Sequence, residues 1–143
     1  MIVFSPIPAH YLPKMQQIER VSNPYPWPAE SLQDGWQQFA HLGAFLQTEL
    51  VAFVLYRQIV DEAEIIHLVC DKKHQGQGHA YSLLQALGQQ LQANQVASVF
   101  LEVREDNHRA RQLYENFGFV TVGHRPNYYG GRHDALIQRL DLT

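Results

Sequence analysis

Residues 71–81 read DKKHQGQGHAY and join an apolar segment to a periodic one. The apolar segment, EIIHLVC at residues 64–70, is rich in Ile, Leu and Val and predicts a strand. Apolar residues then repeat at helical spacing, which predicts a helix over residues 78–93. Glycine lets a backbone approach a ligand closely, and the unpaired N–H groups of a helix start favour an anion. The stretch therefore predicts a phosphate-binding turn, or a turn that uses Gly76 and Gly78 only for geometry.

Strand and helix patterns alternate on both sides of this unit. Further helices are expected at residues 11–21, from Pro28 onward, and at residues 107–117, where Gly118 suits a C-terminal cap. Further strands are expected at residues 2–7, 43–47, 51–60, 98–104, 119–123 and 135–140, with a hairpin turn at Thr48 and Glu49. The order predicts an α/β fold with a mixed central sheet of about six to seven strands and about four helices.

Length and composition describe an ordinary globular protein. With 143 residues and no repeat or linker, we expect a single domain over residues 1–143. The start carries no basic, apolar leader, and no apolar run approaches the roughly 18 residues of a membrane span. One cysteine excludes an internal disulfide and fits a reducing compartment. The formal net charge of −3 argues against strong binding to nucleic acid. We expect a cytoplasmic monomer without direct contact to nucleic acid or membrane.

Two common phosphate motifs are excluded at residues 75–81. No Gly-Lys-Ser/Thr ending is present, and Tyr81 stands where a dinucleotide fingerprint needs its last Gly. The pattern Gln75-x-x-Gly78-x-Ala80 instead resembles the pyrophosphate-binding signature of the GNAT acetyltransferases. The resemblance implies a GNAT fold, acetyl-coenzyme A as co-substrate, and a backbone cradle for its pyrophosphate. The cradle residues would be Gln75, Gly76, Gln77, Gly78, His79, Ala80 and Tyr81.

The same resemblance extends to the strand before this loop. It implies that the backbone of Leu68, Val69 and Cys70 holds the pantetheine arm and the thioester. Gly76 is a departure, because many relatives carry a basic residue there that could help bind a phosphate.

A second pair of segments reads LEVREDN at residues 101–107 and LYENFGF at residues 113–119. A strand and the helix that follows it can bring Glu102 and Tyr114 to one cleft. Both segments resemble the GNAT subgroup that acetylates the N-terminal alanine of a small-subunit ribosomal protein. The resemblance implies that Glu102 is the general base, that Tyr114 is the general acid, and that Asn107 contacts the cofactor. Without the resemblance, Glu102 would be interpreted as a solvent-exposed residue, Tyr114 as a residue of the core or its rim, and Asn107 as a helix N-cap.

Two aromatic segments complete the resemblance. Tyr25 and Trp27, in NPYPWP at residues 23–28, match the family's Phe-Pro-Trp loop, and Tyr128 and Tyr129 lie in a Gly-rich loop at residues 127–131. In relatives these regions flank the peptide-binding groove. A hydrophobic staple into the second helix is the alternative for Trp27, and a plain hairpin tip is the alternative for the tyrosines.

Other residues with possible chemistry are interpreted conservatively. Eight histidines are present, but no spacing matches a zinc motif, so we expect no metal. An acyl-enzyme at Cys70 is conceivable, although no base clearly pairs with it, and burial as a small apolar residue is favoured.

Together these features predict a protein N-terminal acetyltransferase that acts by direct attack within a ternary complex. The expected acceptor is the α-amino group of an N-terminal alanine, on a protein or peptide that is expected to be ribosomal. Three alternatives stay open: a GNAT enzyme acting on a lysine side chain or a small amine, a non-catalytic acyl-coenzyme A module, and a nucleotide-binding module.

Overall fold

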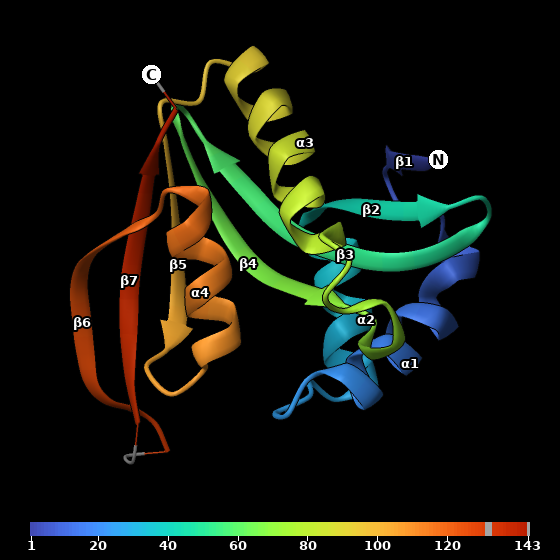
Figure 1. The fold of residues 1–143 in the computed structure, drawn as a ribbon, viewed down its shortest axis with the longest axis horizontal. Coiled ribbons are helices and arrows are strands. Elements are labelled where there is room, and N and C mark those ends of the chain that lie inside the picture. The colour runs from blue at the N-terminus through green and yellow to red at the C-terminus, as the bar shows by residue number, and fades with distance from the viewer. Residues whose placement is uncertain (131–132, 143) are drawn as a thin grey trace. The chain divides into compact units, whose positions relative to one another are not determined.

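The computed structural model describes residues 1–130 and 133–142 and confirms an α/β fold with a mixed sheet (Figure 1). The described strands pair in the order β1-β2-β3-β4-β5-β7-β6. The strands are β1 (Ile2–Ser5), β2 (Ala40–Leu46), β3 (Glu49–Ile59), β4 (Glu62–Cys70), β5 (Ser98–Arg104), β6 (Val120–Tyr129) and β7 (His133–Asp141). The helices are α1 (Leu12–Ser22), α2 (Ala29–Gln38), α3 (His79–Ala93) and α4 (His108–Phe117), with short 3-10 turns at Ala9–Tyr11 and Lys72–His74. None of the helices described here has both the length and the hydropathy needed to cross a membrane.

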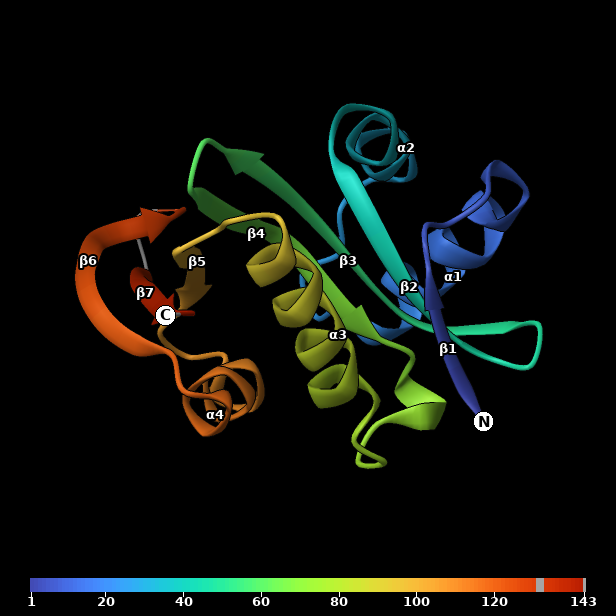
Figure 2. The same cartoon turned by 90° about the horizontal axis from the view of Figure 1, so that it is seen from above.

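The chain divides into two compact units, and each is described by itself. Unit 1 comprises residues 1–57 and 67–87, and unit 2 comprises residues 58–66 and 88–143. In unit 1, β1, β2 and β3 form antiparallel pairs. Helices α1 and α2 lie on one side of these strands, and the first turns of α3 lie on the other (Figure 2).

The apolar run of β3 explains the core of unit 1. Its six residues from Leu50 to Leu55 are completely buried, because helices cover both faces of the strand. Of the residues expected to line one side of α3 in this unit, Leu83, Leu84 and Leu87 are buried, whereas Ala80 is half-buried. Such periodic burial is the main source of helix stability in a folded protein.

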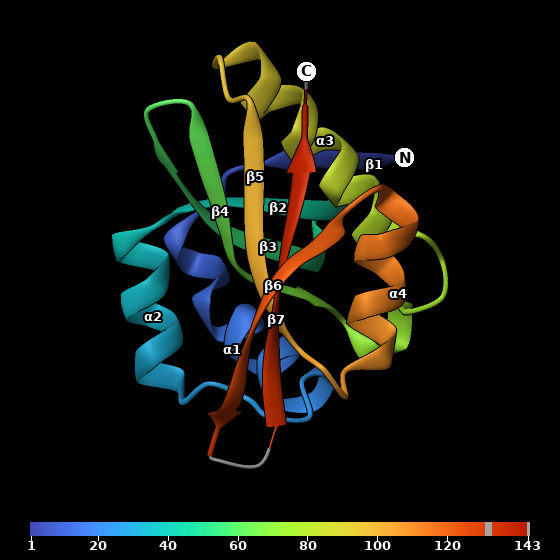
Figure 3. The same cartoon turned by 90° about the vertical axis from the view of Figure 1, so that its left-hand side faces the viewer.

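In unit 2, β5 pairs in parallel with β4 and antiparallel with β7, which in turn pairs with β6 (Figure 3). The side chains of β5 alternate along the strand: Val99, Leu101 and Val103 are buried, whereas Phe100 and Glu102 are half-buried. Helix α4 packs against the face that carries the buried set. Two contacts place it there: Gln138 Nε2 of β7 lies 3.4 Å from Glu115 Oε2 of α4, and a Cβ on Gly118 would meet Leu140 Cδ1 at 3.2 Å.

Several expected boundaries were wrong. Strand β1 ends at Ser5 instead of residue 7, and β2 begins at Ala40 instead of residue 43. The hairpin between β2 and β3 turns at Gln47 and Thr48, with Gln47 at φ 55°, so Glu49 already belongs to β3. Strand β6 runs on to Tyr129 instead of ending at residue 123, so both tyrosines stand on a strand and not in a loop. The strand can continue through Pro126 because β6 is the edge strand, where proline is tolerated. Gly131, in the expected loop, lies outside the described residues.

Candidate active site

The turn between β4 and α3 has the backbone geometry expected of an anion cradle. Gly76 and Gly78 adopt φ angles of 83° and 84°, a left-handed conformation that residues with a Cβ rarely adopt. A Cβ built on either glycine would meet no atom within 4 Å, so the space beside the turn is open. The amide of Ser82 bonds to the Gly78 carbonyl at 3.0 Å. Residues 79–81 thus form the first turn of α3, whose N–H groups have no acceptor within the helix.

Two side chains of this turn, Gln75 and Gln77, make hydrogen bonds within the protein. Gln75 Nε2 donates to the Cys70 carbonyl at 3.1 Å, and His79 Nε2 lies 3.1 Å from Gln77 Oε1. Asp71 is buried, and its amide donates to the Val51 carbonyl of β3 at 2.9 Å. These bonds anchor the turn on β3 and β4 while the sides of Gly76 and Gly78 stay open. The residues present therefore fit a pyrophosphate held by main-chain donors.

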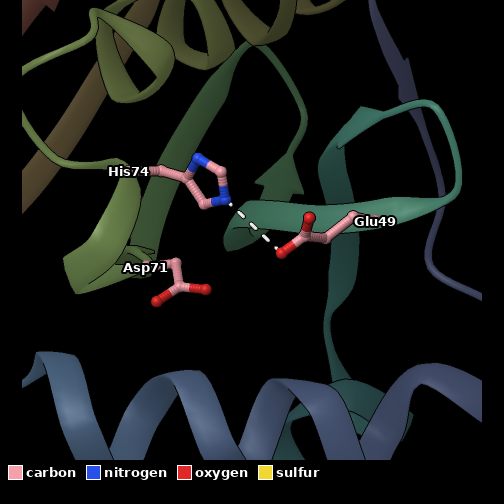
Figure 4. Close-up of side chains that lie close together, drawn as sticks. All are labelled: Glu49, Asp71 and His74. Carbon is pink, nitrogen blue, oxygen red and sulfur yellow. Dashed lines mark hydrogen bonds and ion pairs between the residues drawn. The ribbon is translucent and has the colours of Figure 1, made fainter.

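Beside the turn lies the one group of described side chains with metal-ligand spacing: Glu49, Asp71 and His74 offer ligand atoms within 4.8 Å of one another (Figure 4). Two ammonium groups already neutralise these carboxylates. Lys73 Nζ lies 2.9 Å from Glu49 Oε2, and Lys14 Nζ lies 3.7 Å from Glu49 Oε2 and 3.8 Å from Asp71 Oδ2. A dication would have to displace both lysines, so the group is better described as an ion-pair network that braces the Lys72–His74 turn.

The β4 residues expected to hold the thioester lie at the end of the strand, directly before the turn. Val69 is buried, and Leu68 and Cys70 are half-buried. Among the described residues, the ladder between β4 and β5 runs from Glu62–Ser98 to Ile65–Leu101, although both strands continue beyond it. The Cys70 thiol lies 3.7 Å from the Asp71 carbonyl oxygen, which is a weak acceptor contact and not a pairing with a base.

Strands β5 and β6 bring Glu102 together with the expected acceptor residues Tyr128 and Tyr129. Arg125 of β6 places its Nη2 3.2 Å from Glu102 Oε1 and its guanidinium 5.4 Å from the centre of the Tyr128 ring. Arg104 lies 5.1 Å from the centre of the Tyr129 ring. Burial raises the pKa of Tyr129, and the negative charge of Glu102 raises it further. We name these five residues the β5–β6 cluster.

Tyr114 and Glu102 belong to opposite faces of this part of the sheet. Across the β5–β7 ladder, Leu101 pairs with Gln138 and Glu102 pairs with Ile137. Directly paired residues of antiparallel strands point to the same face. Since α4 covers the Gln138 face, Glu102 points to the other one. The two groups would therefore approach a reactant from different faces of the sheet, and a cleft that they share stays a prediction.

Tyr114 belongs to α4, and its side chain is buried. Its ring packs edge-on against Phe119, with ring centres 5.7 Å apart. Burial raises the pKa of the Tyr114 phenol above its usual value, so the phenol keeps its proton at neutral pH. Asn107 caps the same helix: its Oδ1 accepts from the amide of Ala110 at 3.2 Å. The N-cap role suggested by the sequence is thus present, and a cofactor contact stays a prediction.

In the aromatic loop before α2, Tyr25 is exposed to solvent, whereas Trp27 packs against the protein. Tyr25 is 56% exposed, whereas Trp27 is half-buried. The Trp27 ring stacks on His67 of β4, with ring centres 4.3 Å apart and planes 16° apart. A Cβ on Gly35 of α2 would meet Trp27 Cζ3 at 3.2 Å, so the alternative of packing against the second helix also holds.

Sequence reasoning missed four residues with partners at these sites. Arg104 and Arg125 were missed because β6 was expected to end before Pro126. Glu19 and His67 were missed as a pair because they are far apart in sequence. One signal existed for Glu19: it follows Met15 by one helical turn, on the face that α1 buries.

Comparison with known proteins assigns the family. The profile of the acetyltransferase (GNAT) family matches residues 12–119. The chain belongs to the GNAT acetyltransferase family, and it is an N-acetyltransferase that uses acetyl-coenzyme A. The ribosomal protein bS18-alanine N-acetyltransferase of Haemophilus ducreyi is 34% identical, with 90% of this chain and 92% of that protein covered. The Escherichia coli enzyme of the same name is 31% identical, with 92% of each covered.

Solved structures support the same assignment. The crystal structure of the ribosomal-protein-S18-alanine N-acetyltransferase from Escherichia coli matches with a TM-score of 0.91 at 30% identity. The match covers 100% of this chain and 95% of that one. The GNAT fold expected from the sequence is confirmed.

Proposed function

We propose that this protein acetylates the α-amino group of an N-terminal alanine on a ribosomal protein related to bS18. The observation that carries the proposal is the similarity, over about nine-tenths of each chain, to two enzymes named for that reaction. The β5–β6 cluster supports it, since a carboxylate beside two tyrosines suits an amine at the start of a peptide. We also propose that the protein acts in the cytoplasm as a monomer, without direct contact to nucleic acid or membrane.

For the co-substrate, the proposed cradle consists of the amides of residues 76–81, with Gln75 bracing the turn from behind. The dipole of α3 adds to the attraction for the pyrophosphate. The end of β4, at Leu68, Val69 and Cys70, would align the pantetheine arm by strand-like hydrogen bonds. Amides of this segment would also stabilise the oxyanion of the tetrahedral intermediate.

Replacing Gly78 by Ala is expected to raise KM for acetyl-coenzyme A by about 5- to 30-fold while kcat changes little. A left-handed conformation costs a residue with a Cβ about 1–2 kcal/mol, and each 1.4 kcal/mol is tenfold in affinity. The strained turn would relax in the free enzyme, and binding would have to restore it. Steady-state kinetics at saturating peptide measures the effect.

Gly88 provides the matched control for that substitution. It lies in α3, where a Cβ would also meet no atom within 4 Å, and its backbone is helical. Gly88→Ala should leave KM unchanged and stabilise the protein by up to about 1 kcal/mol. Equal KM values for Gly78→Ala and wild type would contradict the cradle.

The acceptor amine must lose a proton before it can attack. An α-amino group has a pKa of about 7.7–8.0, so much of it is protonated at neutral pH. We propose that Glu102 accepts this proton, directly or through water, as general base. The amine nitrogen then bonds to the thioester carbonyl carbon, and the C–S bond breaks. No bond to the enzyme forms, in keeping with direct attack in a ternary complex.

On the opposite face, Tyr114 is proposed to act on the leaving sulfur. A coenzyme A thiolate should resemble a cysteine thiolate, with a pKa of about 8.5. The pKa of the Tyr114 phenol lies above its usual value through burial, so lasting transfer of its proton to sulfur is uphill. The phenol therefore stabilises the departing thiolate chiefly as a hydrogen-bond donor, and a phenolate that did form would regain a proton from solvent.

The test of the function is a comparison of three peptides of the bS18 amino terminus. One has a free N-terminal alanine, one has that amine blocked, and one has the amine blocked but carries an added internal lysine. Release of the coenzyme A thiol measures turnover. We expect rapid acetylation of the free peptide and background rates for both blocked peptides.

Each alternative function has its own outcome in this comparison. Equal rates for the lysine peptide would indicate a side-chain acetyltransferase and overturn the proposed acceptor. Stabilisation by coenzyme A in a thermal shift, with no turnover of any amine, would indicate a binding module. Stabilisation by ATP or NAD in preference to coenzyme A would indicate a nucleotide-binding module.

A further inference from the structure

Glu19 is a buried carboxylate that the proposed chemistry does not use. It lies in the last turn of α1 and is only 1% exposed. Its Oε1 lies 2.6 Å from His67 Nε2, and its Oε2 accepts from the Trp27 amide at 3.0 Å and from Asn23 Nδ2 at 2.7 Å. Burying a carboxylate is costly unless several donors compensate it. Both oxygens have such donors, so this is a specifically built site.

The donors keep Glu19 ionised. Burial alone would raise the pKa of its carboxyl, but the hydrogen bond and the charge of His67 lower it, and the Trp27 amide and Asn23 lower it further. The net pKa lies below the ordinary value. A carboxylate is an acceptor only, and hydrogen bonds to an ionised group are shorter and stronger than those between neutral groups.

Two of these three donors, Asn23 Nδ2 and the Trp27 amide, belong to the connection between α1 and α2, residues 23–28. This segment has no strand or helix of its own, and its three prolines provide no N–H donor. Its amides at Tyr25 and Trp27 are bound by Asn23 Oδ1, at 3.0 Å, and by Glu19. The Trp27 ring in turn stacks on His67, whose position Glu19 fixes. One carboxylate thus holds the backbone and the aromatic face of the connection together.

We propose that Glu19 and His67 are positioning residues that preform the Tyr25–Trp27 connection as a wall for the acceptor peptide. The inference rests on the proposed function, which makes Tyr25 and Trp27 acceptor contacts. Without the pair, the connection would have to be ordered during binding, which lowers affinity for the acceptor.

The experiment separates acceptor binding from the rest of the reaction. Glu19→Gln gives Trp27, Asn23 and His67 an amide in place of a carboxylate, and His67→Phe keeps a ring against Trp27 but loses the hydrogen bond. We expect KM for the N-terminal alanine peptide to rise at least about fivefold in both variants. kcat and KM for acetyl-coenzyme A should stay within about twofold of wild type. Glu30→Gln, at an exposed position in the first turn of α2, is the matched control and should change neither KM.

A fluorescence measurement keeps the proposal testable if a variant is less stable. The chain has two tryptophans, so a Trp36→Phe background leaves Trp27 as the sole reporter. Adding Glu19→Gln to this background should shift Trp27 emission to the red before any peptide is added. Unchanged emission, unchanged peptide KM, or parallel rises of both KM values would overturn the inference. A wild-type enzyme that is inactive on the peptide would overturn the proposed function, and the inference with it.

Discussion

Replacing Glu102 by Gln is expected to lower kcat/KM for an N-terminal alanine peptide by about 10²- to 10⁴-fold at neutral pH, the usual contribution of a general base. The amide keeps the size of the side chain but cannot accept the amine proton. The deficit should narrow as the pH rises past about 8, because more of the α-amine is then already deprotonated. A pH series of initial rates measures both effects.

Stability should hardly change in this variant. The Arg125 partner of Glu102 is about half exposed, and a solvent-exposed ion pair contributes only about 0–1 kcal/mol. Glu105→Gln is the control, since Glu105 stands close by and carries the same charge, facing His133 at 3.8 Å. If Glu102→Gln had wild-type rates, or if the two variants lost kcat/KM equally, Glu102 would not be the general base.

Replacing Tyr114 by Phe is expected to lower kcat by about 10- to 100-fold. The phenol would donate one hydrogen bond to a developing thiolate, and bonds to charged groups contribute about 1.5–3 kcal/mol. The loss should fall on kcat, because the thiolate forms only as the reaction proceeds. Single-turnover rates at saturating substrates measure this step directly.

The packing around Tyr114 makes the substitution a mild one. Phe keeps the ring and its edge contact with Phe119, so the melting temperature and the affinity for coenzyme A should be close to those of wild type. A variant that turns over at the wild-type rate would show that the buried phenol has only a packing role. A variant that loses coenzyme A affinity instead would assign the phenol to cofactor binding.

Local patterns were sufficient to predict much of this fold. Periodicity identified α3, because its apolar residues recur on the one side that is buried. The pair Gly76 and Gly78 predicted a tight turn, and both glycines have the left-handed φ angles that glycine adopts readily. The motif around Gln75 identified the family, which the comparisons confirm.

Features that depend on strand pairing could not be predicted in the same way. The extension of β6 through Pro126 depends on its place at the sheet edge, which sequence periodicity does not reveal. Glu102 and α4 lie on opposite faces of the sheet, and this arrangement follows from the β5–β7 register. The contact between Glu19 and His67 joins residues 48 positions apart, from a helix and a strand with no shared motif.

The most direct test of the central claim is tandem mass spectrometry of a purified bS18-type ribosomal protein after incubation with this enzyme and acetyl-coenzyme A. The account predicts a single new acetyl group, carried on the α-nitrogen of the first residue, an alanine. Acetyl groups on lysine side chains alone, or an unmodified protein after incubation with enzyme that binds coenzyme A, would contradict it.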